Sequence, residues 1–263
     1  MNTFFVNLPV RYVHKDRGYL DFFLEHRLSP ELGLDAAAID CLDERWHQNV
    51  ADELKAAGLA CSMHFPFFDL RPGSLDDLIL HATRRRLAAA QRIAEMYAPQ
   101  HIIAHAGFSD YAMDFYEEWL ARAVETCSSF MQGWPGHPPL FLENTYEQSP
   151  DPLLALLSGL ASHNAGICFD AGHWHSFAGG CKRKNLSTWL QALSPCVRHL
   201  HLHDNDGSFD QHQGLGRGTI PWEEFFSLLR ELKLHPTITL EPHSKEDIDH
   251  SLAFIAAHKN WFV

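Results

Sequence analysis

The strongest constraint on the fold is a regular alternation of short β-rich runs and longer helical patterns along the whole chain. Strandlike runs rich in Val, Ile, Leu and Phe occupy residues 4–9, 30–34, 60–65, 101–106, 139–143, 166–170, 197–203 and 237–241. Strand–helix alternation favours parallel strands joined by right-handed crossovers. Eight repeats in 263 residues predict a single (β/α)8 TIM barrel of the α/β class, with an open doubly wound sheet as the alternative.

Helical periodicity between these runs supports the same architecture. The clearest pattern extends from Leu75 to Tyr97, where apolar residues recur along one stripe. A capping box from Ser244 to Asp247 predicts the start of the last helix. Because no linker or low-complexity tract interrupts the alternation, we expect residues 1–263 to form one domain.

Composition and charge narrow the class of protein. With 46% hydrophobic residues and a net charge of −12, the chain is neither disordered nor suited to bulk electrostatic binding of nucleic acid or of a membrane. No apolar run has the length of a membrane span, and residues 4–10 are too short and wrongly flanked for a signal peptide. The six cysteines form no CxxC pair, so we expect a cytoplasmic protein.

Side chains that commonly bind metals end six successive predicted strands, and three more follow in loops. The strand-end residues are His64, His105, Glu143, Asp170, His201 and Glu241, and the loop residues are His173, Asp210 and His212. Any one of these residues has a structural interpretation, as a hydrogen-bonded histidine or a helix cap. Active sites of TIM barrels lie at the carboxyl ends of the strands, so the repeated pattern favours one shared site.

The charges of this set call for metal ions. Four carboxylates at one barrel mouth would raise one another's pKa values unless a positive charge lay among them. Imidazoles and carboxylates without a thiolate suit zinc, manganese or iron. At three or four protein ligands per ion, with one carboxylate shared, nine ligands would hold up to three ions.

One stretch is especially diagnostic: His-Leu-His-Asp-Asn at 201–205, Asp-x-His at 210–212 and Gly-Leu-Gly-Arg-Gly-Thr-Ile at 214–220. Together with the other ligands it resembles the endonuclease IV branch (AP endonuclease family 2) of the xylose isomerase-like barrel superfamily. The same stretch is also similar to sugar-phosphate isomerases and epimerases. The resemblance implies three metals, held by His64, His105 and Glu143; by Glu143, Asp170, His201 and Glu241; and by His173, Asp210 and His212.

Three functions remain open for such a site. The first is phosphoester hydrolysis at a multinuclear centre, zinc being the favoured metal, with manganese or iron as alternatives. The second is isomerisation or epimerisation of a sugar or sugar phosphate on one metal, with Glu143 and Glu241 as the catalytic acid and base and His173 binding a hydroxyl. The third is a metal-binding barrel without catalysis. The number of ligands favours hydrolysis.

The flanking loops bear on the substrate. They lack the motifs expected of a repair nuclease and carry few Lys or Arg, which favours a small sugar or phosphoester and disfavours duplex DNA without excluding it. Asn144, Trp174 and Arg217 are the expected substrate contacts, Arg217 being alternatively a solvated loop residue. His203 and His243 are expected to point away from the ligands or to support them from behind. The oligomeric state stays open.

Overall fold

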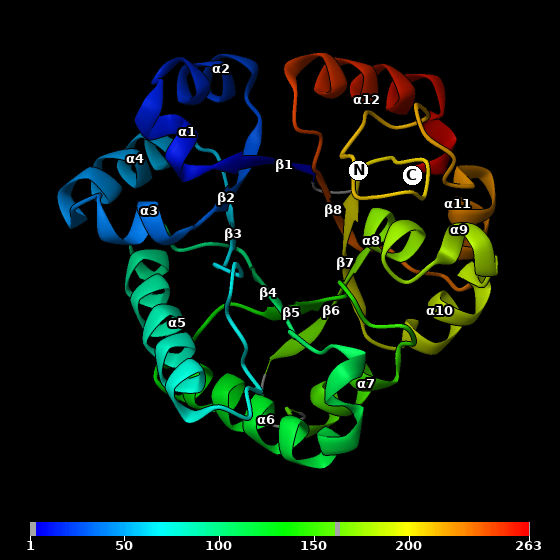
Figure 1. The fold of residues 1–263 in the computed structure, drawn as a ribbon. Coiled ribbons are helices and arrows are strands. Elements are labelled where there is room, and N and C mark those ends of the chain that lie inside the picture. Colours follow the sequence, from blue (N-terminus) through cyan, green and yellow to red (C-terminus); the bar gives the residue numbers. More distant parts are fainter. Residues whose placement is uncertain (1–3, 161–163, 263) are drawn as a thin grey trace.

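Eight parallel strands close into a barrel in sequence order, and helices surround it (Figure 1). The computed structural model describes residues 4–160 and 164–262. Pairing of β1 with β8 closes the ring, so the fold is the predicted TIM barrel and the open sheet is excluded. The strands are β1 (Phe4–Pro9), β2 (Ser29–Gly33), β3 (Ser62–His64), β4 (Ile102–His105), β5 (Leu140–Glu143), β6 (Ala165–Asp170), β7 (Val197–Leu202) and β8 (Thr237–Leu240).

Helices connect successive strands along the outside of the barrel. They are α1 (Val10–Lys15), α2 (Gly18–His26), α3 (Ala36–Asp40), α4 (Glu44–Ala56), α5 (Asp77–Tyr97), α6 (Tyr116–Gln132), α7 (Asp151–Gly159), α8 (Ala171–Ser176), α9 (Gly180–Arg183), α10 (Leu186–Leu193), α11 (Trp222–Glu231) and α12 (Lys245–Ala257), with 3-10 turns η1 (Asp110–Phe115) and η2 (Lys259–Trp261). The periodic stripe became α5, and Ser244 caps α12 by accepting from the Asp247 N–H, as predicted. None of the helices in the described parts of the chain combines the length and apolarity needed to cross a bilayer.

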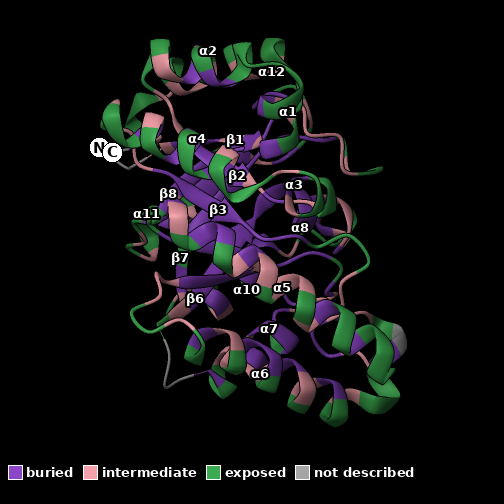
Figure 2. Cartoon of the chain, turned by 90° about the vertical axis from the view of Figure 1, so that its left-hand side faces the viewer, coloured by how far each residue is buried: buried purple, intermediate pink, exposed green. Residues whose placement is uncertain are grey.

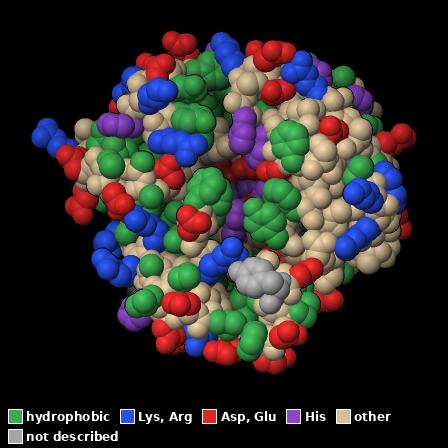
Figure 3. All heavy atoms as spheres, viewed as in Figure 1, with side chains coloured by type: hydrophobic (Ala, Val, Ile, Leu, Met, Phe, Trp, Pro, Cys, Tyr) green, Lys and Arg blue, Asp and Glu red, His purple; other side chains and the backbone are tan. Residues whose placement is uncertain are grey.

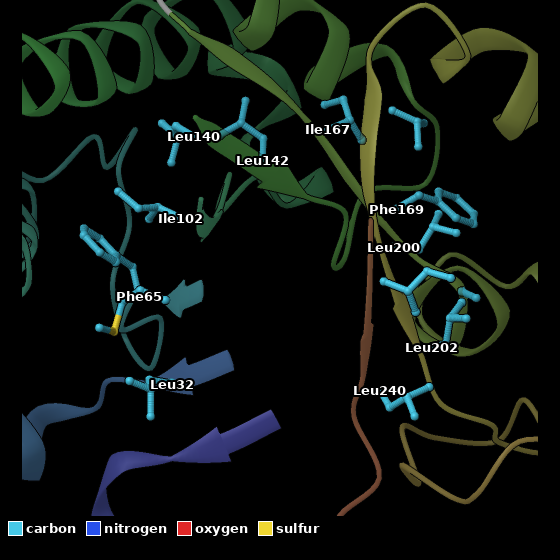
Figure 4. Packing of buried hydrophobic residues seen from close by; sticks show 14 of the residues in the cluster. Leu32, Phe65, Ile102, Leu140, Leu142, Ile167, Phe169, Leu200, Leu202 and Leu240 are labelled. Atoms are coloured by element: carbon cyan, nitrogen blue, oxygen red, sulfur yellow. The ribbon is translucent and has the colours of Figure 1, made fainter. Parts of the chain in front are cut away.

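The main core lies between the strands and the helices. Along β7, Leu200 and Leu202 belong to this outer core, whereas His199 and His201 alternate with them and face the barrel axis. Side chains from successive strands build the same layer, and the outer helices bury their inner faces against it (Figures 2 and 4). The outer layer therefore carries most of the apolar burial that stabilises the fold.

The barrel interior is polar for this architecture. A small apolar cluster of Ile103, Phe141 and Cys168 lies inside the ring. Bulky branched residues usually fill a TIM barrel, but here the buried Glu31 and Thr239 contact each other inside it, at 2.9 Å. Buried polar groups are costly unless they have partners, so this interior indicates a structure that serves the site above it.

Candidate active site

Parallel pairing brings the predicted ligands to the same level of the barrel. His105 on β4 is in register with Glu143 on β5, and Asp170 on β6 is in register with His201 on β7. Each strand from β3 to β8 ends at or next to its predicted ligand. The backbone therefore leaves the barrel at that point, while the side chain points into the barrel mouth. In Figure 3, acidic and histidine side chains form the base of a central hollow with hydrophobic side chains beside it.

The structure brings all nine predicted ligands together in three groups of donor atoms. Within each group, one donor atom per residue lies within 4.8 Å of all the others. Glu143 belongs to two groups. The groups are His64, His105 and Glu143; Glu143, Asp170, His201 and Glu241; and His173, His203, Asp210 and His212. The grouping matches the one that the resemblance implied, with His203 added, and the metal-binding role of each residue stays a prediction.

Glu143 is the carboxylate that joins the groups. Its Oε2 lies 2.9 Å from His64 Nε2 and 3.0 Å from His105 Nε2, and its Oε1 lies 3.1 Å from His173 Nδ1 and 3.2 Å from His201 Nδ1. Burial alone would raise the pKa of Glu143, but the charges and hydrogen bonds of these imidazoles hold it well below 4.5. The carboxylate is therefore ionised and ready to bridge two positive centres.

Three of the histidines are fixed in the tautomer that a metal ligand needs. His64, His173 and His212 each place Nδ1 against a backbone carbonyl, which can only accept, so Nδ1 carries the hydrogen. The remaining nitrogen, Nε2, can then offer its lone pair to a cation. The carbonyls are those of Phe65 (2.9 Å), Asn144 (3.0 Å) and Glu241 (2.7 Å). This donor set fits a divalent ion in the group of His64 and in the group of His173 and His212.

Asp210 gathers the third group. Its Oδ2 lies 2.8 Å from His212 Nε2 and 3.4 Å from His173 Nε2, and its Oδ1 lies 3.6 Å from His203 Nε2. Of the two alternatives for His203, pointing away from the ligands is wrong, because a strand's period of two keeps it on the same face as His201, and supporting the ligands from behind stays a prediction. Gly172 makes room for this ring, since a Cβ there would overlap His203.

Burial opposes the charged form of His173, but neighbouring carboxylates reverse the effect. The charge of Asp170, together with hydrogen bonds to Asp210 and Glu143, raises the pKa of His173 well above 6.5. The pKa of Asp210 is lowered in turn, because its bonds to His173 and His212 outweigh its desolvation. Protons on the imidazoles thus balance the negative charge of the carboxylates. A metal ion that displaced these protons would supply the positive charge in their place.

The three expected substrate contacts lie elsewhere. Asn144 is buried and pairs with the backbone N–H and C=O of Asp170, so it fixes that ligand's strand. Trp174 is packed in the core and donates to Asn185. Arg217 is held by Glu246 and Asp247 at 2.6 and 2.8 Å. None of the three lines the cavity at the barrel mouth, whose volume is about 490 Å³.

Glu31 supports the site from below, and the sequence analysis missed it. It is fully buried on β2, with Oε1 3.0 Å from His201 Nε2, while Ser62 and Thr239 donate to Oε2. His201 thus presents Nδ1 to the metal groups and Nε2 to Glu31. The only sequence signal was a charged residue inside a strand predicted to be buried on both faces, between Pro30 and Leu32.

Glu147 is a second buried carboxylate that the sequence analysis missed. Its Oε2 accepts from the backbone N–H of Thr145 at 2.6 Å, and its Oε1 has no hydrogen-bond partner among the described residues. Desolvation raises its pKa to about 7. This residue shapes the loop after β5, close behind Glu143.

The chain matches the protein family described as Xylose isomerase-like TIM barrel over residues 27–258. It belongs to that family. A curated relative, the uncharacterized protein MJ1311 of Methanocaldococcus jannaschii, is 24% identical over 198 residues, which cover 70% of this chain. The match spans 65% of that protein, so the chain covers slightly less than two thirds of its relative's length.

Solved structures share the fold along nearly the whole chain. A D-tagatose 3-epimerase-like protein superposes with a TM-score of 0.81 at 20% identity, over 100% of this chain and 98% of its own. The TTHB071 protein from Thermus thermophilus, from a crystal soaked with ZnCl2, gives 0.74 at 26% identity, over 98% and 97%. Further neighbours of this family member are sugar 3-epimerases.

We expect Glu31→Gln to weaken zinc binding by about 10- to 100-fold, because the amide lacks the charge that orients and polarises His201. Competition with a chromophoric chelator measures the affinity. Glu25→Gln, an exposed carboxylate on α2, is the matched control. If Glu31→Gln binds zinc as tightly as the control, Glu31 only fills the barrel.

We expect Glu147→Gln to change how stability depends on pH. Because the folded-state pKa of Glu147 (about 7) lies above its ordinary value of 4.5, the folded chain binds more protons between these values and loses stability as pH rises. From pH 5 to pH 8 the free energy of unfolding should fall by about 2 kcal/mol more in the wild type than in the variant. Urea unfolding of chelator-treated protein measures it, and parallel pH curves would contradict the burial argument.

Proposed function

We propose that this protein is a divalent-metal-dependent phosphoesterase acting on a small molecule. The observation that carries the proposal is the meeting of three donor groups at one barrel mouth, with Glu143 in two of them. Three divalent ions would outweigh the four carboxylates of these groups and make the site attract anions. A single ion would leave the site negative, which disfavours a phosphate.

Each residue has a role in this proposal. Bound ions would supply Lewis acidity and bring the pKa of a water molecule down to about 7. Glu143 sets the spacing of two groups, because its two oxygens face different histidines. Glu241 and Glu143 are the two carboxylates of their group that line the cavity, so Glu241 is placed to exchange a proton with the substrate.

Two arginines that the sequence analysis did not select line the same cavity. Arg11 lies in the first turn of α1 and is held by Asp35 at 2.8 Å, and Arg71 follows β3. Guanidinium groups bind phosphate oxygens well, in pairs of parallel hydrogen bonds. These residues take the place that was expected for Arg217.

A second candidate is isomerisation or epimerisation of a sugar on one ion. The comparisons support it better than hydrolysis, because the neighbours bear the names of sugar epimerases. Glu143 Oε1 and Glu241 Oε2 lie 3.2 and 3.4 Å from His201 Nδ1, so two carboxylates stand ready to move substrate protons. We place it second because it leaves the Asp210 group and the His64–His105 pair without a metal.

Zinc stoichiometry separates the two candidates. We expect about three zinc ions per chain, and about two in Asp210→Asn, because Asp210 contacts every histidine of its group. Calorimetric titration of chelator-treated protein measures the number. His81→Ala, which removes an exposed histidine of α5, is the control for surface binding.

Activity assays separate the same two candidate functions. Zinc-loaded protein should hydrolyse bis(p-nitrophenyl) phosphate, and Asp210→Asn should lose about 100-fold in kcat/KM while His81→Ala keeps it. The second candidate would be favoured over hydrolysis if the protein bound one ion per chain, interconverted ketose epimers and released no nitrophenol. If the protein bound zinc but catalysed neither reaction, the result would support a metal-binding barrel without catalysis.

A further inference from the structure

Two stacks of aromatic side chains extend from the predicted metal ligands to the mouth of the cavity. On one side Phe67 stacks on His105 with centroids 4.3 Å apart, and Phe68 lies 4.4 Å beyond Phe67. On the other side Phe177 stacks on His173 at 5.3 Å, and Tyr146 lies 4.7 Å beyond Phe177. The first stack follows β3, and the second joins the loop after β5 to α8.

The outer ring of each stack is exposed. Phe68 keeps 69% of its surface in contact with solvent and Tyr146 keeps 53%, although both line the cavity. Rings so exposed add little to the core, so packing within this chain does not account for their position. Apolar side chains gathered around a cavity are a common mark of a binding surface.

We propose that these rings bind a planar aromatic group of the substrate, which makes the substrate a small phosphoester with an aryl or heteroaryl substituent. The inference rests on the phosphoesterase function proposed above and adds the substrate class. Offset stacking on Phe68, the more exposed of the two outer rings, would hold the aromatic group at the mouth while the phosphate reaches the donor groups below.

Size and charge agree with a small ligand of this kind. A cavity of about 490 Å³ can hold one ring system and a phosphate, but it is much too small for a nucleic-acid duplex. Arg11 and Arg71 line the cavity together with the exposed rings. The chain as a whole carries a net charge of −12, which disfavours a long polyanion.

Binding of three phosphonates to zinc-loaded protein tests the inference without relying on catalysis, because their C–P bonds resist hydrolysis. Phenylphosphonate offers a planar ring, cyclohexylphosphonate offers apolar area without a flat face, and methylphosphonate offers the anion alone. We expect phenylphosphonate to bind about ten-fold more tightly than cyclohexylphosphonate, as measured by calorimetry. Phe68→Ala should abolish this preference, and Phe68→Trp should restore it.

Phe115→Ala removes an exposed phenylalanine (55% against 69% for Phe68) outside the cavity lining, so it is the control and should keep the preference. The inference is overturned if the phenyl and cyclohexyl compounds bind equally, or if the preference survives Phe68→Ala. In either case, binding of methylphosphonate would still support the phosphoesterase. Failure of all three compounds to bind overturns the proposed function, and the substrate class with it.

Discussion

The contacts of Glu143 with four imidazoles are the interaction on which the site depends. A fully buried carboxylate keeps its charge when positive groups or hydrogen-bond donors surround it, and histidines from β3, β4, β7 and α8 surround Glu143, so elements far apart in sequence meet at one point. Because a parallel barrel fixes the height of each strand relative to its neighbours, the three histidines on strands meet Glu143 at one level, and α8, which follows β6, adds His173. The strand register therefore places the charge of Glu143 at the point where two of the donor groups meet.

The polar interior below the site has a cost that the outer layer offsets. Glu31, Ser62 and Thr239 occupy positions where branched apolar residues would pack, and their mutual hydrogen bonds limit the loss. The large apolar cluster between strands and helices does not share these positions, since side chains alternate along each strand. Separating the two layers lets the inner one be shaped by the site while the outer one maintains the fold.

The sequence allowed the barrel and the convergence of nine side chains to be predicted, because both follow from one-dimensional patterns. Alternation of strands and helices predicts the ring, and a ligand at the end of a strand needs no knowledge of its neighbours. Glu31 escaped because its importance comes from touching His201, 170 positions away, and no local pattern records that contact. The position of Arg217 outside the cavity lining could not be predicted for the related reason that its partners, Glu246 and Asp247, approach it only in the folded chain. His203 was misplaced by a wrong use of the strand period rather than by a lack of information.

A carboxylate core such as Glu143, Asp170, His201 and Glu241 can serve either proton transfer on a sugar or attack on phosphorus, so the core alone does not choose the reaction. The choice lies in what surrounds it. The His64–His105 pair and the Asp210 group add mostly neutral donors on two sides, so each further ion brings more positive charge than its ligands bring negative charge. Under the proposed function, that excess would let the site hold a phosphate, and the aromatic stacks that begin at His105 and His173 would extend the selectivity of the site outward from the proposed metal ligands.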